Sequence, residues 1–322
     1  MAVAWRLQWY LHRSGILGAP AYLNLEPTNR CNLSCRWCVA SSARPGGLLE
    51  LSLAESILAQ AADAGVGEIR FFLAGEPLLH PSIGDLVAAA SARGLRTVLH
   101  TNAMLLDGDR ARSLIEAGLD DVSFSINGVD NERIRQVQRG ADLDTMVENV
   151  RGFHEMRRRL GGRGPRTTLQ IIQPPDEAVI SDSRVAALLG SPGPDRILRL
   201  APHGWGGQLR SEEVVLRGRR YHPCQPLWQG MSVGWDGRVF LCCADLNGAH
   251  PVGDLVRQSL TDVWHGDRLM EVRQRVASNR REGLPLCASC DAVWWKYHPI
   301  VHDIRRALWR VAGRRLWVDS TG

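Results

Sequence analysis

The chain is nearly devoid of lysine. Lys296 is its only lysine, so arginine supplies the rest of its 39 basic residues. No run of basic residues is interleaved with aromatic side chains, as a groove for stacked bases would require. The net charge of +5 is also small for 322 residues. These features argue against a nucleic-acid-binding protein, and we attribute the arginine content to a GC-rich genome.

Long apolar runs are missing as well. No stretch of about 18 apolar residues occurs, so the sequence predicts no membrane span. Residues 1–15 carry Arg6 and His12 within their apolar stretch and lack a small-residue cleavage site, unlike a secretory signal. The eight cysteines fall into two groups with spacings typical of metal ligands rather than of a secreted disulfide framework. We therefore expect a cytoplasmic protein in a reducing compartment.

Short β-rich runs alternate with amphipathic segments between residues 21 and 200. This alternation predicts βαβ units around a parallel sheet, and six such units make three quarters of an eight-unit barrel. Parallel barrels carry their sites at the C-terminal ends of the strands. The predicted strands are Tyr22–Leu25, Glu68–Leu73, Arg96–His100, Asp121–Ile126, Thr167–Ile172 and Arg196–Leu200. The predicted helices are Ser52–Ala64, Ile83–Arg93, Gly108–Ala117, Leu143–Arg159 and Asp176–Leu189.

The remaining segments differ from this pattern. Residues 1–20 predict a short amphipathic helix that packs on the main domain, with a peripheral membrane anchor as the alternative. Residues 21–201 form the predicted barrel. Residues 202–322 have frequent glycine and tryptophan, short strands and several cysteines, and they predict a second, smaller α+β domain. Its basic tail, residues 304–318, packs on the domain or meets a partner or membrane surface.

Three cysteines, Cys31, Cys35 and Cys38, follow the first predicted strand with the spacing CxxxCxxC. Four thiolates complete the ligation of an iron–sulfur cube, so three leave one iron open to a small molecule. A zinc knuckle is the alternative. The spacing resembles the signature of the radical S-adenosylmethionine (SAM) enzymes. The resemblance implies a partial (β/α)6 barrel, a [4Fe-4S] cluster whose open iron chelates SAM, and reductive cleavage of SAM to a 5′-deoxyadenosyl radical.

Other segments resemble the SAM-binding elements of that family. Ala74-Gly75-Glu76-Pro77 is similar to the GGEP element, whose glutamate contacts the SAM amino group, and His100-Thr101-Asn102 is similar to the TN(G) element. Ser125 matches the serine of S-x-D-G, although Asn127 replaces the acid. Arg139 resembles an arginine that meets the SAM carboxylate, or it is a charge at a helix end. The implied SAM-binding residues are Gly75, Glu76, Asn102, Ser125 and Arg139.

The second cysteine group lies in the C-terminal region. A CxxC pair with two distant cysteines is typical of a four-thiolate site for zinc or an iron–sulfur cluster. Asp236-Gly237, between Val233 and Val239, predicts a hairpin that brings Cys224 close to Cys242. The five cysteines of this group are Cys224, Cys242, Cys243, Cys287 and Cys290.

This second group resembles the SPASM and twitch extensions of radical SAM enzymes, which bind auxiliary [4Fe-4S] clusters. Five cysteines suit one such cluster, an arrangement similar to that of the butirosin-pathway aminocyclitol dehydrogenase. We expect Cys242, rather than Cys243, to ligate the auxiliary cluster. Cys243 is then a buried apolar side chain, or it donates a hydrogen atom to the substrate radical, as in radical SAM epimerases. The expected auxiliary ligands are Cys224, Cys242, Cys287 and Cys290.

The resemblance describes how the reaction begins and leaves its outcome open. If the auxiliary cluster accepts an electron and a base takes the hydroxyl proton, a carbinol becomes a ketone. We therefore expect dehydrogenation of a secondary alcohol of a sugar, an aminocyclitol or a related small molecule in a biosynthetic pathway. The alternatives are an epimerase, a dehydratase, a maturase of a ribosomal peptide, or a non-enzymatic electron-transfer or zinc-binding module. The candidate catalytic residues are Cys243, His203, Tyr221 and Asp245.

Two expectations concern partners. The clusters imply an electron donor such as a flavodoxin or a ferredoxin. About 20 residues precede the barrel, too few for the N-terminal recognition domain that peptide-modifying relatives often carry. This favours a small-molecule substrate over a peptide.

Overall fold

The structure is a computed structural model that describes residues 18–40, 44–162, 164–209, 220–221, 224–290 and 293–295. Almost all of the predicted N-terminal helix and the whole predicted tail lie outside these described residues.

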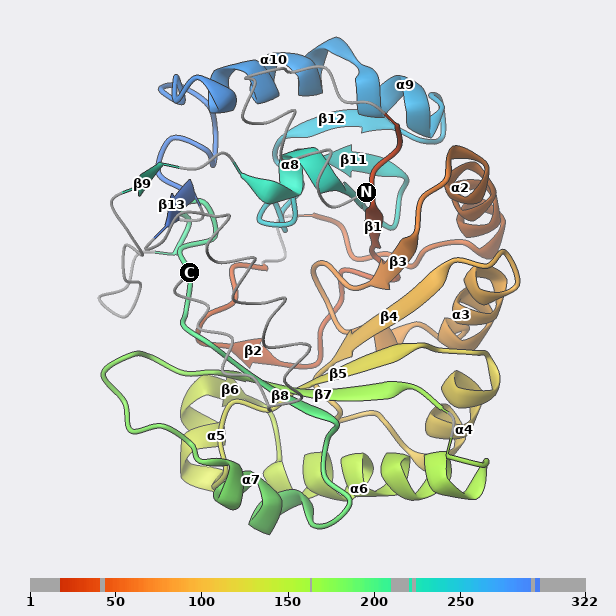
Figure 1. Cartoon of the computed structure of the whole chain (residues 1–322), viewed down its shortest axis with the longest axis vertical. Helices are drawn as coiled ribbons and strands as arrows, with labels where there is room; N and C mark the ends of the chain where they lie inside the picture. The colour runs from red at the N-terminus through yellow and green to blue at the C-terminus, as the bar shows by residue number, and fades with distance from the viewer. Residues whose placement is uncertain are drawn as a thin grey trace.

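One nine-stranded sheet organises the molecule, in the order β12-β11-β10-β1-β3-β4-β5-β7-β8 (Figure 1). Neighbouring strands from β1 to β8 pair in parallel, so they form the six-stranded partial barrel that the sequence predicts. The barrel strands are β1 (Tyr22–Leu25), β3 (Glu68–Phe71), β4 (Arg96–Thr101), β5 (Asp121–Ser125), β7 (Arg166–Ile172) and β8 (Arg196–Leu200).

Helices cover the outer face of this sheet, and Figure 1 shows α2, α3, α4 and α6 in succession along it. Their apolar faces pack on the strands; in α2, for example, Ile57, Leu58 and Ala61 are fully buried. The barrel helices are α2 (Leu51–Ala64), α3 (Ile83–Ser91), α4 (Gly108–Glu116), α5 (Asn131–Val137), α6 (Leu143–Arg159) and α7 (Asp182–Leu189). A short 3-10 helix, η1 (Pro77–Leu79), follows β3.

The two faces of the barrel strands differ in burial. In β4, Thr97, Leu99 and Thr101 are buried, whereas the alternate side chains are half-buried. Because successive side chains of a strand point to opposite faces, the half-buried set faces the interior of the barrel. That set includes His100, and its counterpart on β3 includes Arg70. The interior is therefore polar and is not completely filled by side chains.

The C-terminal region continues the same sheet. The predicted hairpin is present as β10 (Gly230–Val233) and β11 (Arg238–Phe240), and β10 also pairs in parallel with β1. The cysteine-rich α+β region therefore adds β10, β11 and β12 to the open edge of the barrel, whereas its β9 and β13 form a separate two-stranded sheet. Its other elements are β9 (Arg220–Tyr221), α8 (Gln225–Gln229), β12 (Pro251–Asp254), α9 (Leu260–His265), α10 (Asp267–Ala277) and β13 (Trp294–Trp295).

The fold departs from the predicted elements in three places, one of which is α5 (Asn131–Val137), where no helix was predicted. The helix predicted over Asp176–Leu189 begins only at Asp182, because Ser181 caps it by accepting a hydrogen bond from the Arg184 N–H. The sequence also gave no indication of β2 (Ser34–Cys35) and β6 (Gln138–Arg139), a pair of two-residue strands. Within the described residues, no helix is both long enough and apolar enough to span a bilayer.

Candidate active site

The three-cysteine segment lies at the C-terminal end of β1, where a parallel barrel carries its site. Short β2 holds Cys35 against β6, and the Leu33 N–H donates to Cys31 Sγ over 3.4 Å. Burial, together with the neighbouring thiolates of Cys38 and Cys31, raises the pKa of the Cys35 thiol to about 12. Three thiolates this close together require a cationic partner, which suits a metal cluster.

The Ala74-Gly75-Glu76-Pro77 loop packs directly on the segment that precedes Cys31. Gly75 has φ +82°, and a Cβ there would lie 2.3 Å from the Thr28 carbonyl oxygen. Only glycine fits this combination of left-handed backbone and close approach. The Glu76 N–H also donates to the Arg30 carbonyl over 2.8 Å. The loop and the cysteine segment are thus fixed to each other through backbone.

Glu76 is a buried carboxylate held entirely by hydrogen-bond donors. It accepts from the Thr101 hydroxyl (2.7 Å) and from the N–H groups of Asn102 (2.8 Å) and Leu78 (3.1 Å). Burial raises the pKa of this carboxyl, and these hydrogen bonds oppose the rise. No described side chain forms an ion pair with it. A ligand ammonium group would supply the missing positive charge.

Of the other predicted SAM-binding residues, Asn102 contacts this loop, whereas Ser125 and Arg139 lie beside the β2–β6 pair. The Asn102 amide donates to Asn32 Oδ1 over 2.9 Å, which ties β4 to the cysteine segment. The Ser125 carbonyl accepts from the Gln138 amide over 2.9 Å, at the point where β6 meets β2. Arg139 is exposed beside Cys35 and lowers the pKa of its thiol.

Asn127, which stands where the family usually has an acid, has a structural partner. Its Oδ1 accepts a hydrogen bond from the Ile172 N–H over 2.7 Å, joining the ends of β5 and β7. An amide can serve here because only an acceptor oxygen is used.

A buried ion pair lies behind the loop and was missed in the sequence. Glu26, fully buried, pairs with Arg44 at 2.6 Å and accepts from the Ala74 N–H at 3.2 Å. Burial raises the pKa of the Glu26 carboxyl, and Arg44 opposes the rise. Glu26 immediately follows β1 in the segment LNLEPTNRC, so a charged residue ending an apolar strand was the available signal.

The C-terminal cysteines gather as the spacing predicted, with one exception. Burial raises the pKa of the Cys224 thiol strongly, and the charges of Cys290, Cys242 and Cys287 add to the rise. Burial likewise raises the pKa of the Cys242 thiol, and the charges of Cys243, Cys287 and Cys290 add to the rise. Arg281 donates a hydrogen bond to the backbone carbonyl of Cys287. Its charge also lowers the pKa of the Cys287 thiol, which burial raises.

Cys243 adjoins Cys242, but the charges of Cys224, Cys287 and Cys290 are not among the causes of its own pKa shift. Burial raises the pKa of the Cys243 thiol, and Arg70, from the interior face of β3, lowers it. Cys243 packs with Leu73, Ala74, Phe240 and other apolar residues. It therefore lies next to the loop that carries Glu76.

The three other candidate catalytic residues have defined partners. The Tyr221 hydroxyl donates to the Val276 carbonyl, and burial raises the pKa of this phenol to about 12. Both carboxylate oxygens of Asp245 accept backbone N–H groups, from residues 249 and 250, at 2.9 Å. The His203 ring packs at a tilt against Trp205, with centroids 4.2 Å apart, and its Nδ1 accepts from the Trp205 backbone N–H.

Trp205 connects the two cysteine groups. Its indole N–H donates to the Trp37 carbonyl, between Cys35 and Cys38, over 2.8 Å. The next residue, Gly206, accepts a hydrogen bond from the Ser289 hydroxyl, between Cys287 and Cys290. Trp205 itself has φ +49°, an uncommon conformation for a bulky residue. This segment is a second feature that the sequence did not reveal.

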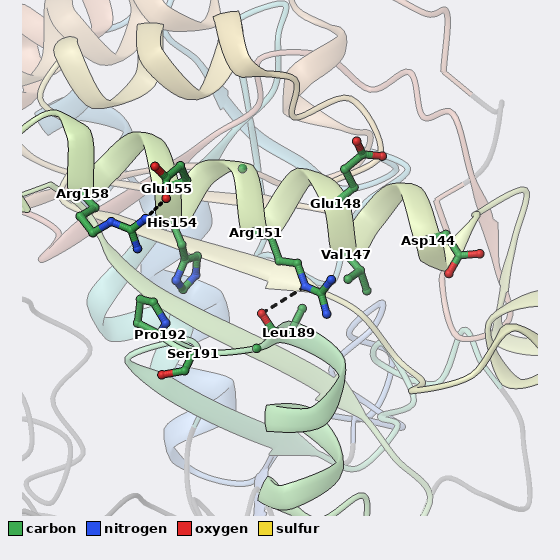
Figure 2. Close-up of a pocket in the computed structure, with 12 residues that line it drawn as sticks. Asp144, Val147, Glu148, Arg151, His154, Glu155, Arg158, Leu189, Ser191 and Pro192 are labelled. Carbon is green, nitrogen blue, oxygen red and sulfur yellow. Dashed lines mark hydrogen bonds and ion pairs between the residues drawn. The ribbon is translucent and has the colours of Figure 1, made fainter.

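Two cavities among the described residues lie elsewhere. One, of about 820 Å³, is a groove between α6 and residues 189–192, where His154 points toward Pro192 and Arg151 donates to the Leu189 carbonyl (Figure 2). The other, of about 430 Å³, opens at the N-terminal ends of β1 and β3. Neither adjoins the cysteine segment, so neither is the candidate site.

The donor sets fit iron–sulfur clusters. No three described His, Cys, Asp or Glu side chains are placed to ligate one metal ion. The thiolates of a cube bind different irons and stand further apart than the ligands of a single ion. A SAM-binding cluster requires three thiols near a carboxylate that lacks an ion-pair partner among the described residues. An auxiliary cluster requires four further thiols. Both sets are present.

Comparison with known proteins agrees with this chemistry. Residues 25–169 match the radical SAM superfamily, and residues 224–291 match SPASM, an iron–sulfur cluster-binding domain. GTP 3′,8-cyclase of Chlorobaculum tepidum is 41% identical over 122 residues, which are 37% of this chain and 36% of that protein. PqqA peptide cyclase of Rhizobium meliloti is 39% identical over 115 residues, 35% of this chain and 30% of that protein. The chain thus spans about a third of the length of these relatives.

Solved structures extend the likeness to the fold of nearly the whole chain. BtrN in complex with AdoMet and 2-DOIA has a TM-score of 0.58 at 18% identity, covering 84% of this chain and 92% of BtrN. Streptococcus suis SuiB bound to precursor peptide SuiA has a TM-score of 0.68 at 17% identity, covering 94% of this chain and 76% of SuiB.

These matches confirm the predicted fold class, the SAM cofactor and its [4Fe-4S] cluster, and the auxiliary iron–sulfur site. Two observations therefore converge, one from the grouping of the cysteines and one from the matched domains. The chain carries a radical SAM domain over residues 25–169 and a C-terminal SPASM domain over residues 224–291.

Proposed function

We propose that this enzyme oxidises a secondary alcohol of a sugar, an aminocyclitol or a related small polar molecule, in the cytoplasm. When bound and reduced, the SAM cluster of this superfamily generates a 5′-deoxyadenosyl radical that removes a substrate hydrogen atom. Cys31, Cys35 and Cys38 would hold this cluster. Gly75 and Glu76, with Asn102, Ser125 and Arg139, would position SAM.

The grouping of four C-terminal thiols carries the proposal. After a hydrogen atom leaves a carbinol carbon, oxidation to a ketone requires a one-electron acceptor and a base for the hydroxyl proton. Cys224, Cys242, Cys287 and Cys290 would hold one auxiliary cluster as that acceptor. We assign Cys242 to this cluster because the charges of Cys287 and Cys290 raise the pKa of its thiol, whereas Cys243 packs against Leu73 and Ala74.

His203 is our preferred base. Tyr221 and Asp245 are engaged by backbone partners, and the raised pKa of Tyr221 disfavours the phenolate that could accept a proton. The His203 ring packs on Trp205, which belongs to the same apolar cluster as Ala74 and Cys243. An imidazole in this position would be next to the SAM-binding loop.

The position of Cys243 favours a second candidate, an epimerase. A buried thiol beside the SAM loop could return a hydrogen atom to the substrate radical from the opposite face. The product would then be an epimer, and the resulting thiyl radical would need one electron and one proton from the reductant, a flavodoxin or ferredoxin, to restore the thiol.

The polar barrel interior supports a hydroxylated substrate. His100 and Gln170 are half-buried on the interior face of β4 and β7. Together they offer donors and acceptors suited to hydroxyl or amino groups. BtrN, whose solved complex contains 2-DOIA, shares the fold, which adds a weaker support from analogy.

Iron content and SAM cleavage, measured anaerobically, test the proposal. We expect about eight irons in the wild type and about four in a Cys31/Cys35/Cys38→Ala variant, with 5′-deoxyadenosine formed only by the wild type. The reduced enzyme is then given pooled sugars and aminocyclitols, and separately peptides, each deuterated at carbon. A dehydrogenase transfers deuterium to 5′-deoxyadenosine and yields a product two hydrogens lighter.

The variants distinguish the outcomes. A product with the formula of the substrate, which carries one deuterium when unlabelled substrate reacts in D2O and is lost in Cys243→Ser, would establish the epimerase instead. Deuterium transfer from peptides alone would show that the substrate is a peptide rather than a sugar or an aminocyclitol. Zinc rather than iron at the C-terminal cysteines would remove the electron acceptor and with it the oxidative reaction.

A further inference from the structure

We propose that Glu26 and Arg44 are positioning residues that couple SAM binding to the C-terminal cysteine region. The inference rests on the proposed function only in assigning SAM to the Gly75–Glu76 loop and the auxiliary cluster to the C-terminal cysteines. Neither residue touches SAM or a cluster in this proposal. They act through the segments that do.

Glu26 holds the SAM loop from behind. Its Oε1 accepts the Ala74 N–H at 3.2 Å, and Ala74 directly precedes Gly75. Its Oε2 accepts the Trp235 N–H at 3.2 Å, in the turn between β10 and β11. One fully buried carboxylate therefore spans the SAM loop and the hairpin of the SPASM region.

Arg44 extends this link toward the cysteines. Its two terminal nitrogens bind the two Glu26 oxygens at 2.9 and 2.6 Å, and one of them also donates to the Leu246 carbonyl at 2.9 Å. Its guanidinium lies 4.8 Å from the centroid of the Phe240 ring. Phe240 and Leu246 flank Cys242 and Cys243 in the sequence. The Arg44 guanidinium thus joins the segment that carries Cys242 and Cys243 to the Glu26 carboxylate.

The packing leaves little freedom in this link. A Cβ on Gly248 would lie 2.7 Å from the Phe240 ring and 2.9 Å from Arg44 Cδ. Both charges are almost completely buried, so each requires the other in place. A shift of residues 240–248 would therefore move Arg44, and through Glu26 it would move the Ala74 N–H.

Coupling of this kind has a thermodynamic signature. If residues 240–248 are ordered by the auxiliary cluster, loss of that cluster should weaken SAM binding at the other site, by about tenfold for a typical coupling free energy. The coupling should vanish when the ion pair is removed. A residue that only stabilised the fold would lower the melting temperature without linking the two sites.

The test is a double-mutant cycle read as SAM affinity. The reconstituted, oxidised protein is titrated with SAM by anaerobic calorimetry, as wild type, Glu26→Gln, Cys287→Ser/Cys290→Ser, and the combination. No substrate or turnover is needed, so the readout is independent of whether the enzyme oxidises an alcohol. Asp195→Asn is the matched control, because Asp195 pairs with Arg157 at 2.6 Å on the outer side of the barrel.

We expect the serine variant to bind SAM about tenfold more weakly than the wild type while retaining about four irons. In the Glu26→Gln background the same serine substitutions should change SAM affinity less than twofold. Asp195→Asn should keep the full tenfold effect. Equal weakening by the serine substitutions in both backgrounds, or none in the wild type, would overturn the proposal.

A second variant covers a failure of Glu26→Gln to fold. Arg44→Lys keeps the positive charge and loses the two-pronged geometry. It should bind SAM more weakly with eight irons still present, and its affinity should no longer respond to loss of the auxiliary cluster. If loss of the auxiliary cluster weakened SAM binding in Arg44→Lys as much as in the wild type, the result would contradict the role of the Arg44 guanidinium.

Discussion

Replacing Gly75 by alanine should slow SAM cleavage by about 100-fold at a predictable cost in stability. Gly75 has φ +82°, and the left-handed conformation alone costs an L-residue about 1–2 kcal/mol. The added Cβ would also lie 2.3 Å from the Thr28 carbonyl and 2.6 Å from the Arg30 carbonyl. Both contacts are with backbone, so relief requires the loop to move away from the cysteine segment. A displacement of about 1 Å can lower a rate by about 100-fold.

Gly65 provides the matched control. Its φ is +83°, almost the same, but a Cβ there would meet nothing within 4 Å. Gly65→Ala should therefore lose about 1–2 kcal/mol of stability and leave SAM cleavage unchanged. Thermal melts and 5′-deoxyadenosine formation, measured side by side, separate strain from displacement. Similar SAM cleavage by the two variants would refute the argument that Gly75 is required by the approach to Thr28.

The remaining predictions concern charge and ligation. Glu76→Gln removes a charge that accepts three hydrogen bonds, so SAM affinity should fall about 10- to 100-fold by calorimetry, and an unchanged affinity would contradict an ammonium partner. Burial lowers the pKa of His100 to about 4, so protons favour the unfolded state, and stability should decline as pH falls from about 6.5 to about 4. His100→Gln should flatten that decline in denaturant melts, and an unaltered slope would assign it to other groups. Cys242→Ser should lower the iron content from about eight to about four, whereas Cys243→Ser should not; the reverse result would exchange the two assignments.

The barrel was predictable because its signals are local. The alternation of strand and helix patterns gave all six parallel strands, and the carboxyl end of β1 gave the position of the cysteine segment. The Asp236-Gly237 hairpin was equally clear, since turn chemistry depends on few residues. That β10 would pair with β1 was not readable, because Tyr22 and Gly230 are distant in sequence and no local rule joins them.

The site was predictable where a spacing or motif carries the chemistry, as for Cys31 or Glu76. It was not predictable where function depends on contacts between distant backbone groups. Glu26 binds residues 44, 74 and 235, and Trp205 binds the carbonyl of residue 37. Such links leave no periodic pattern in the chain, and only the folded geometry reveals them.

The pairing of β10 with β1 determines whether the barrel has an exposed edge strand. A chain cut after residue 201 would leave β1 as an open edge, with the unpaired N–H and C=O groups that promote strand-to-strand aggregation. The SPASM region therefore protects the barrel from self-association. In this protein the two modules share one continuous sheet, so a barrel separated from its SPASM region would need another strand to cover that edge.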